Sequence, residues 1–210
     1  MGVDGDGRRE AIGCAEGLTG SEDSWRGFLP WLRGRGPRGA RMVTGDRRQG
    51  MVGALEGAFT QAGYQRCTVH LYRSVFSEVP MRKRALVARM PRAVHAQESR
   101  EAAVARAGEV AADLKGMRLG VAAKVVREGC LETLTYAGFP MRHWTRIRTN
   151  DAVERLDREV RRRTRAVGTF PDGRSALMLV TARPEYVAEC EWGKRRYPDV
   201  SLLENEEVGA

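Results

Sequence analysis

Two carboxylates are the residues of this chain whose type and placement could support chemistry. Asp46 ends a predicted strand, where α/β sheets place ligand-binding residues, and Glu154 lies on a predicted helix rich in arginine. Acidic residues clustered on such a sheet can hold two divalent cations about 4 Å apart, which activate a water or a 3′-hydroxyl and stabilise the leaving oxygen of a phosphodiester. Carboxylates suit this role because Mg²⁺ prefers oxygen ligands.

Each carboxylate also has a simpler interpretation. An aspartate at the end of a strand is more often a cap or turn residue than a ligand. Glu154 precedes Arg158 by four residues, which is the spacing of an ordinary stabilising ion pair on a helix. The residue types alone leave both interpretations open.

Cys67 and His70 form a C-x-x-H pair in the segment "CTVH". A structural zinc site needs four ligands in recognisable pairs, and no second pair is evident in the sequence. The alternative is a packed cysteine followed by a polar histidine at the end of a strand. The remaining cysteines are Cys14, Cys130 and Cys190. They are scattered and predict no disulfide framework, which favours a reducing, cytoplasmic environment.

The segment 155–165 carries six arginines within eleven positions. The whole chain has a net charge of +9 and a sequence pI near 9.9, a balance that favours a polyanionic partner such as DNA or RNA. No apolar run approaches the roughly 18 residues that a membrane span needs. The candidate phosphate contacts are Arg155, Arg158, Arg161, Arg162, Arg163 and Arg165.

The first 71 residues show the alternation of an α/β sheet. We expect a Gly/Asp turn followed by a short strand, and then a helix in 21–36 that is capped by Ser21 and kinked or interrupted by Pro30. The face of that helix expected to be buried carries Trp25, Phe28, Leu29 and Leu32. The segment "ARMVTGD" predicts a strand, a second helix follows it, and "YQRCTVHLY" predicts another strand.

The remainder of the chain is helical in pattern. Residues 72–148 predict an all-helical insertion punctuated by Pro80, Pro91, Gly116 and Gly129, after which the segment "FPMRHWTRIRTN" is expected to return as a loop. A helix near Asp151 should follow, and then a helix interrupted near Pro184 and a frayed acidic tail. The face of the first of these helices expected to be apolar carries Val153, Leu156, Val160 and Val167.

The ordered set of motifs resembles the mutator-type transposases of bacterial insertion sequences. The matching segments are "DGRREAIG", "SEDSWRGFLPWLRGRGPRGARMVTGDRRQG", "YQRCTVHLYRSV", "FPMRHWTRIRTNDAVERLDREVRRRTRAVGTFP" and "ECEWGKRRY". The resemblance implies an α/β fold, here an incomplete ribonuclease-H-like core interrupted by an all-helical insertion. It divides the chain into a first part of the core, the insertion, and a helical C-terminal part: 1–71, 72–148 and 149–210.

The resemblance also implies roles for individual residues. Asp46 looks like the second aspartate of a DDE triad, and Glu154, 108 residues later, looks like its glutamate. Asn150 and Arg155 would be near neighbours. The implied cofactor is Mg²⁺ or Mn²⁺, and the implied partners are the DNA of element ends and target, and further copies of the chain in a homo-oligomer.

The sequence departs from the family pattern at three places. Gly45 stands where the family usually has serine, and Asp151 stands where it commonly has proline. In the family, the first triad aspartate lies on the first core strand, upstream of the initial hairpin. Asp4 and Asp6 fall in the turn after that strand, so neither is expected to replace it. We therefore expect a truncated transposase with little or no activity. The alternative is a non-catalytic DNA-binding or transposase-inhibiting protein; the strand signals before residue 72 disfavour an all-helical nucleic-acid-binding module.

Overall fold

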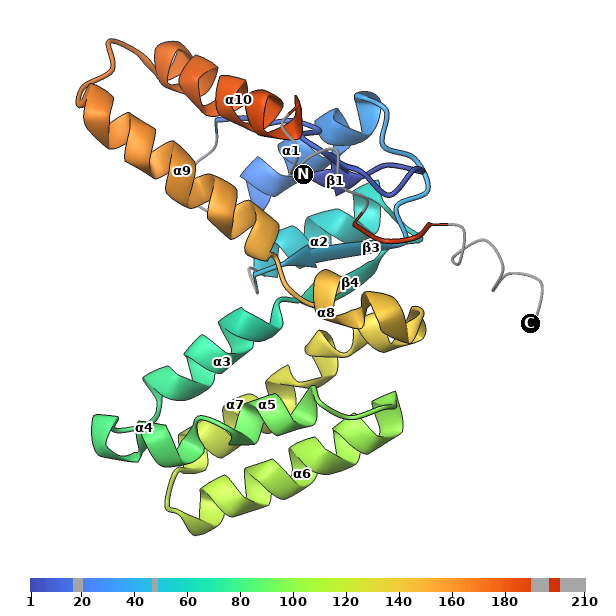
Figure 1. Ribbon diagram of the computed structural model, residues 1–210, viewed down its shortest axis with the longest axis vertical. Helices are drawn as coiled ribbons and strands as arrows, with labels where there is room; N and C mark the ends of the chain where they lie inside the picture. Colours follow the sequence, from blue (N-terminus) through green and yellow to red (C-terminus); the bar gives the residue numbers. More distant parts are fainter. Residues whose placement is uncertain (17–20, 47–48, 190–196, 201–210) are drawn as a thin grey trace, which may run out of the picture. The chain divides into compact units, whose positions relative to one another are not determined.

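The computed structural model describes residues 1–16, 21–46, 49–189 and 197–200 (Figure 1). The chain is mixed α/β and mostly helical, and its described strands form two small sheets. Contacts between residues divide it into two compact units. The first consists of Met1–Ala40, Arg48–Ala62 and Asn150–Ala210, and the second of Arg41–Arg47 and Gly63–Thr149. The division into 1–71, 72–148 and 149–210 stays a prediction.

The first unit begins with the predicted Gly/Asp turn. Strand β1 (Gly2–Val3) pairs in antiparallel fashion with β2 (Arg9–Glu10). Asp4 shapes the turn between them, because its Oδ1 accepts hydrogen bonds from the backbone nitrogens of Asp6 and Arg8 at 3.0 and 2.7 Å. The short strand expected after this turn is present as β2.

Helix α1 (Glu22–Gly34) starts as predicted, with the Ser21 hydroxyl accepting from the backbone nitrogen of Ser24 at 3.3 Å. Of the two effects expected of Pro30, a kink or an interruption, the interruption is wrong, because α1 continues through Pro30. Pro30 is exposed, so the carbonyl that loses its partner can be hydrated. Of the apolar residues predicted to be buried, only Leu29 is, and α1 packs against α2 (Gln49–Ala58).

Two long helices follow in the same unit. Helix α9 (Asp151–Val167) and helix α10 (Gly173–Glu189) form a hairpin, visible in Figure 1. The predicted apolar face of α9 is only partly covered, since Val153 and Val167 are exposed. The predicted interruption near Pro184 is wrong, because α10 continues through that position. The acidic tail and most of the segment "ECEWGKRRY" lie outside the described residues.

The second unit contains a parallel pair of strands. Strand β3 (Met42–Gly45) lies beside β4 (Gly63–Arg66), in the register that pairs Gly45 with Arg66. The prediction of a strand through residue 72 is wrong, because helix α3 (Thr68–Ser77) begins directly after Cys67. In so short a window, the apolar residues of "YQRCTVHLY" fit both the two-residue period of a strand and the 3.6-residue period of a helix. Tertiary packing decides between the two structures.

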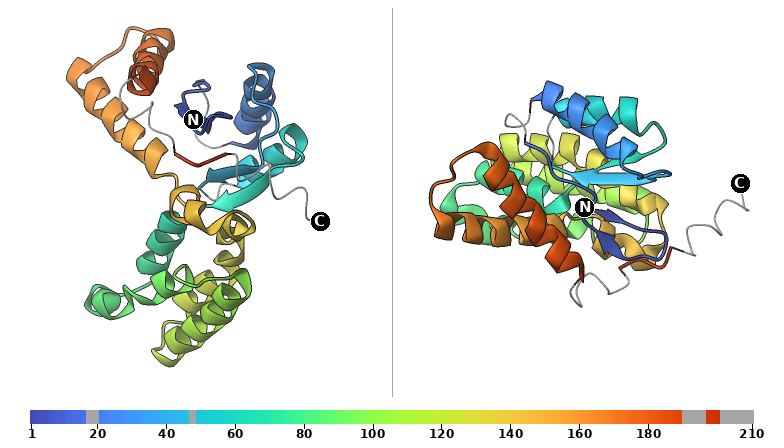
Figure 2. Two further views of the ribbon diagram at one scale, coloured as in Figure 1. Left: turned by 45° about the vertical axis from the view of Figure 1, so that its right-hand side comes forward. Right: turned by 90° about the horizontal axis from the view of Figure 1, so that it is seen from above.

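Helices dominate the rest of this unit, and the four residues predicted to punctuate them do so. Pro80 precedes α4, Pro91 lies in the first turn of α5, and α6 and α7 end at Gly116 and Gly129. In place of the expected returning loop are short 3₁₀ turns and helix α8. Figure 2 shows α6 and α7 side by side. The helices are α4 (Met81–Val87), α5 (Met90–Val94), α6 (Arg100–Gly116), α7 (Gly120–Gly129) and α8 (Trp144–Ile147).

The turn between α6 and α7 is tight. The backbone nitrogen of Leu119 donates to the carbonyl of Leu114 at 2.9 Å, and that of Arg118 donates to Lys115 at 3.0 Å. This is the Schellman pattern, which places one residue in the left-handed conformation. Arg118 occupies that position with a φ of 60°. Leu114 and Leu119 are both buried in the helical core, so apolar packing holds the turn closed.

Buried polar contacts connect β4 to the helical part of this unit. The completely buried Gln65 donates to the carbonyl of Thr133 at 2.8 Å and accepts from the backbone nitrogen of Tyr136 at 2.9 Å. The Thr133 hydroxyl lies 2.8 Å from Nε2 of buried His95, and the Tyr72 hydroxyl lies 2.9 Å from its Nδ1. Because these groups satisfy one another, the strand end and the helices have a defined relative position.

None of the described helices is long and apolar enough to cross a membrane. Among the described cysteines, Cys14, Cys67 and Cys130 form no disulfide.

Candidate functional site

Asp46 directly follows β3, at the carboxyl end of the two parallel strands. This is the edge of a sheet at which α/β proteins bind ligands. The Tyr64 hydroxyl donates to the backbone carbonyl of Asp46 at 2.9 Å, and the Asp46 side chain is 47% exposed. The backbone of Asp46 is thus held by the neighbouring strand while its carboxylate remains accessible to an ion.

The beginning of α3 is attached to the same strand end. The backbone nitrogen of Cys67 donates to the carbonyl of Gly45 at 2.8 Å, which extends the register of β3 and β4 by one bond. The next backbone nitrogen, that of Thr68, donates to the carbonyl of Arg148 at 3.1 Å. Two of the backbone donors at the start of the helix are therefore satisfied by chain segments rather than by a side-chain cap.

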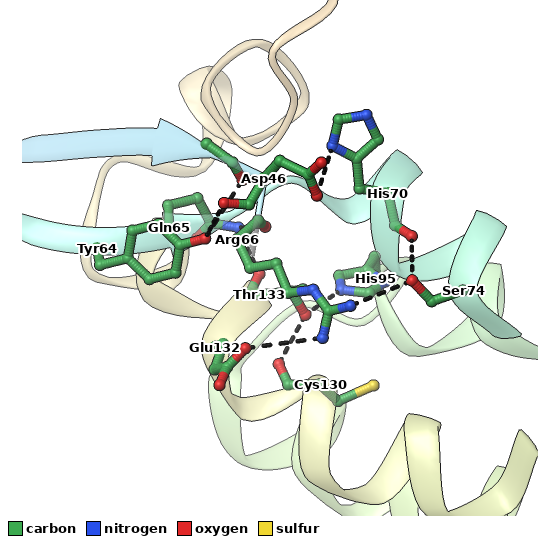
Figure 3. A network of polar contacts seen from close by, with 11 residues as sticks. Asp46, Tyr64, Gln65, Arg66, His70, Ser74, His95, Cys130, Glu132 and Thr133 are labelled. Carbon is green, nitrogen blue, oxygen red and sulfur yellow. Dashed lines mark hydrogen bonds and ion pairs between the residues drawn. The ribbon is translucent and has the colours of Figure 1, made fainter. Parts of the chain in front are cut away.

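His70 lies one turn into α3 and faces Asp46. Its Nδ1 is 3.0 Å from Oδ1 of Asp46, and Figure 3 shows the two side chains pointing toward each other. The prediction of a histidine at the end of a strand is therefore wrong in its element. The structure places His70 on a helix, in contact with the aspartate that the sequence separately identified as a candidate ligand.

Cys67 has a different environment from His70. Its side chain is completely buried, as the packed-cysteine interpretation expects. One ligand atom of Cys67 and one of His70 lie within 4.8 Å of each other, so the pair alone also has a spacing that a metal ion accepts. A hard ion such as Mg²⁺ nevertheless prefers the oxygen of Asp46 to the sulfur of Cys67.

Two residues beside the site are not singled out by the sequence. Tyr64 holds the backbone of Asp46, as described above. Arg66 is buried at the end of β4, where its Nη2 donates to Ser74 at 3.3 Å and its Nη1 lies 3.7 Å from Glu132 (Figure 3). A buried arginine is rare unless it is paired. Its position directly before the C-x-x-H pair is the only signal that the sequence offers.

Glu154 lies in the first turn of α9, in the other compact unit. Its backbone nitrogen donates to the carbonyl of Asn150 at 3.0 Å. A carboxylate in the first turn of a helix interacts favourably with the helix dipole. The predicted helical placement of Glu154, four residues before Arg158, is confirmed.

The arginines of α9 are all exposed. Some are partly neutralised by acidic residues of the same helix, since Arg161 lies 2.8 Å from Asp157, and Arg162 and Arg163 lie 2.8 and 3.4 Å from Glu159. Helical spacing places four of the arginines, Arg161 and Arg162 among them, on one face, where they line a shallow hollow on the surface. These residues are Arg158, Arg161, Arg162 and Arg165, together with Ala166.

Comparison with known proteins identifies the family. Residues 1–192 match the model of the mutator family of transposases. The chain belongs to this family. It is 33% identical over 207 residues to the transposase of insertion sequence element IS1081 of Mycobacterium tuberculosis, covering 96% of this chain and 48% of the relative.

Two further relatives come from other bacteria. The chain is 32% identical to the transposase of element ISRM5 of Rhizobium meliloti, over 87% of this chain and 46% of the relative. It is 28% identical to the transposase of element IS256 in transposon Tn4001 of Staphylococcus aureus, over 87% of this chain and 47% of the relative. The chain thus spans about half the length of these relatives.

Proposed function

We propose that this chain takes part in the transposition of an insertion sequence element, by binding DNA and holding divalent ions for strand cleavage and transfer. Family membership supports the general activity. The observation that carries the proposal is the accessible carboxylate of Asp46 at the carboxyl end of two parallel strands. Such a strand end is where an incomplete ribonuclease-H-like core, the fold we propose, would place the second carboxylate of its triad.

The donors at this strand end fit Mg²⁺ or Mn²⁺. The Asp46 carboxylate offers hard oxygen ligands, and Tyr64 fixes the backbone from which it projects. From the family resemblance we propose Glu154 as a second ligand. Bound divalent ions would supply Lewis-acid activation of a water or a 3′-hydroxyl and stabilisation of the leaving oxygen. The role of the chain's own residues would be to provide these oxygen donors and to hold them in the required orientation.

The arginines of α9 are proposed to contact phosphates. Arg158, Arg161 and Arg165 lie on one face, so they can follow a nucleic-acid backbone along one side of the helix. Contacts of this kind set the position of DNA without reading its sequence. They also make binding weaker as salt rises, because each neutralised phosphate releases counterions. The other proposed contacts are Arg155, Arg162 and Arg163.

The test uses charge-neutralising variants of both carboxylates. Asp46→Asn and Glu154→Gln are compared with the wild type, and Asp157→Asn serves as a matched control because it removes a carboxylate from α9 that pairs with Arg161. Binding to duplex DNA is measured by fluorescence anisotropy with and without Mn²⁺, alongside nicking and joining of DNA that carries element ends. We expect Mn²⁺ to change the affinity for DNA, and any nicking or joining, in the wild type and in the control. In the two variants Mn²⁺ should change neither quantity.

A second candidate function is a DNA-binding protein without catalysis, which could inhibit an intact transposase by joining its oligomer. The six exposed arginines of α9 favour this function, because arginines can contact DNA phosphates without a metal ion. For this function, the Asp46 and Glu154 variants should bind DNA as the wild type does, and Mn²⁺ should change nothing in any variant. Sedimentation of the chain, with and without DNA, tests the proposed homo-oligomer.

A further inference from the structure

The C-x-x-H pair has no assigned role, and the structure gives its two members different surroundings. Cys67 is completely buried at the start of α3, whereas His70 is one turn later and faces Asp46. A spacing of three residues on a helix places two side chains on neighbouring positions of one face. The motif can therefore anchor the helix start with its cysteine and deliver the imidazole to Asp46.

Several contacts fix the position of His70. The backbone bond from Cys67 to Gly45 attaches the helix start to the strand that precedes Asp46. Further along α3, the Ser74 hydroxyl donates to the carbonyl of His70 at 2.9 Å, and Arg66 donates in turn to that hydroxyl at 3.3 Å (Figure 3). The backbone is therefore held on both sides of the Asp46–His70 contact, so the imidazole and the carboxylate project from fixed positions.

Asp46 needs such a partner if it is to bind an ion well. Its side chain is 47% exposed and has two rotatable bonds, so an unrestrained carboxylate would lose rotamer freedom on binding an ion. A second group that hydrogen-bonds to a ligating carboxylate fixes its orientation, and loss of such a group typically costs about 10- to 100-fold in metal affinity. The Nδ1 of His70 lies 3.0 Å from Oδ1, an ion-pair contact whose angle falls short of a hydrogen bond, so a small turn of either side chain is enough to form one.

We propose that His70 is a positioning residue, whose Nδ1–H holds Oδ1 of Asp46 so that the carboxylate is oriented for a divalent ion. The inference rests on the proposed role of Asp46 as a metal ligand. It assigns the histidine of the motif to the aspartate and the cysteine to packing. A different role, direct ligation of the ion by the imidazole nitrogen, is an outcome that the experiment separates.

Three substitutions of His70 distinguish these roles. Asparagine can place an amide donor close to where Nδ1 lies, glutamine places its amide near Nε2 instead, and alanine places none. We measure Mn²⁺ binding to the full chain by calorimetry. The expected result is affinity within a few-fold of the wild type for His70→Asn, and a loss of about 10- to 100-fold for His70→Gln and His70→Ala. Ser77→Ala, an exposed position on the same helix, is the control.

A role in folding alone would not separate the asparagine variant from the glutamine variant in this way. Equal affinity in all three variants and the wild type would refute the proposal, and so would loss in asparagine with retention in glutamine. Nitrogen hyperfine coupling to bound Mn²⁺ from the His70 ring would identify direct ligation and also overturn it. Ser77→Ala should bind as the wild type does.

The contact itself is measured without metal. In the ¹⁵N spectrum of the wild-type histidines we expect Nδ1 of His70 to carry a proton, and we expect its signal to change in Asp46→Asn. An Nδ1 without a proton refutes the positioning role whatever the metal result. If the wild type binds Mn²⁺ no better than Asp46→Asn while Nδ1 is protonated, the proposed metal ligand fails and the contact between the two residues stands.

Discussion

Protonation of His95 should destabilise the helical part of the second unit. Its ring is buried, and burial lowers its pKa to about 4, opposed by the carbonyl of Pro91 and reinforced by the positive charge of Arg148. The Thr133 hydroxyl donates to the carbonyl of Cys130 and so accepts from Nε2 of His95. Burial also raises the pKa of Tyr72 to about 12. Its hydroxyl therefore stays protonated and donates to Nδ1, which holds the ring in its neutral form.

The size of the effect follows from linkage. The histidine of the unfolded chain has a pKa near its ordinary 6.5, and the folded value is about 4. Because the folded pKa is the lower one, the stabilisation is fully present above about pH 6.5 and is lost as the pH falls toward 4. Between about pH 7 and pH 5 the free energy of unfolding should fall by about 2 kcal/mol through this residue alone.

The assay is urea denaturation of the wild type and of His95→Gln at both pH values. Other groups titrate in this window, so the quantity of interest is the difference between the two pH dependences. We expect the variant to be less stable at pH 7 but to lose about 2 kcal/mol less on acidification. Equal losses in both proteins would refute the reasoning. If the variant does not fold, an NMR titration of His95 that gives a pKa above 6 refutes it equally.

Three further predictions concern packing, backbone strain and DNA. Gly129→Ala should lower the free energy of unfolding by about 1–3 kcal/mol, because the new Cβ would lie 2.7 Å from Nη1 of buried Arg66. Gly108→Ala, in open space on α6, should raise it by about 1 kcal/mol. Equal effects of the two substitutions in urea denaturation would contradict this. Arg118→Gly should stabilise the chain by about 1 kcal/mol by relieving a φ of 60°, and an unfolding temperature at or below that of the wild type would count against it. Arg165→Ala should reduce the slope of log affinity for DNA against log salt by about 1, and an unchanged slope would exclude a phosphate contact there.

The elements around the site follow from local sequence signals to different extents. Ser21 caps its helix, and the strand predicted in "ARMVTGD" ends directly before Asp46, because capping chemistry and short apolar runs are local properties. The start of α3 was wrongly predicted as strand. The backbone nitrogens at its start donate to the carbonyls of Gly45 and Arg148. A local sequence pattern cannot predict partners so distant in the sequence.

The candidate site shows the same distinction. The residue types of Asp46 and His70 suggest ligands individually, yet their 3.0 Å contact depends on the parallel pairing of β3 with β4 and on the helix that begins after Cys67. Pro30 shows the converse error. A local rule predicts a kink or an interruption there, but α1 is not interrupted, because an exposed position tolerates the missing backbone donor.

The central claim, that Asp46 and Glu154 act as ligands of one metal centre, is tested most directly by a double-mutant cycle of Mn²⁺ affinity. Calorimetry would compare the wild type, Asp46→Asn, Glu154→Gln and the double variant. Ligands of one centre act as a unit, so the double variant should bind little more weakly than either single variant. Losses that simply add, or affinity unchanged by either substitution, would contradict the account.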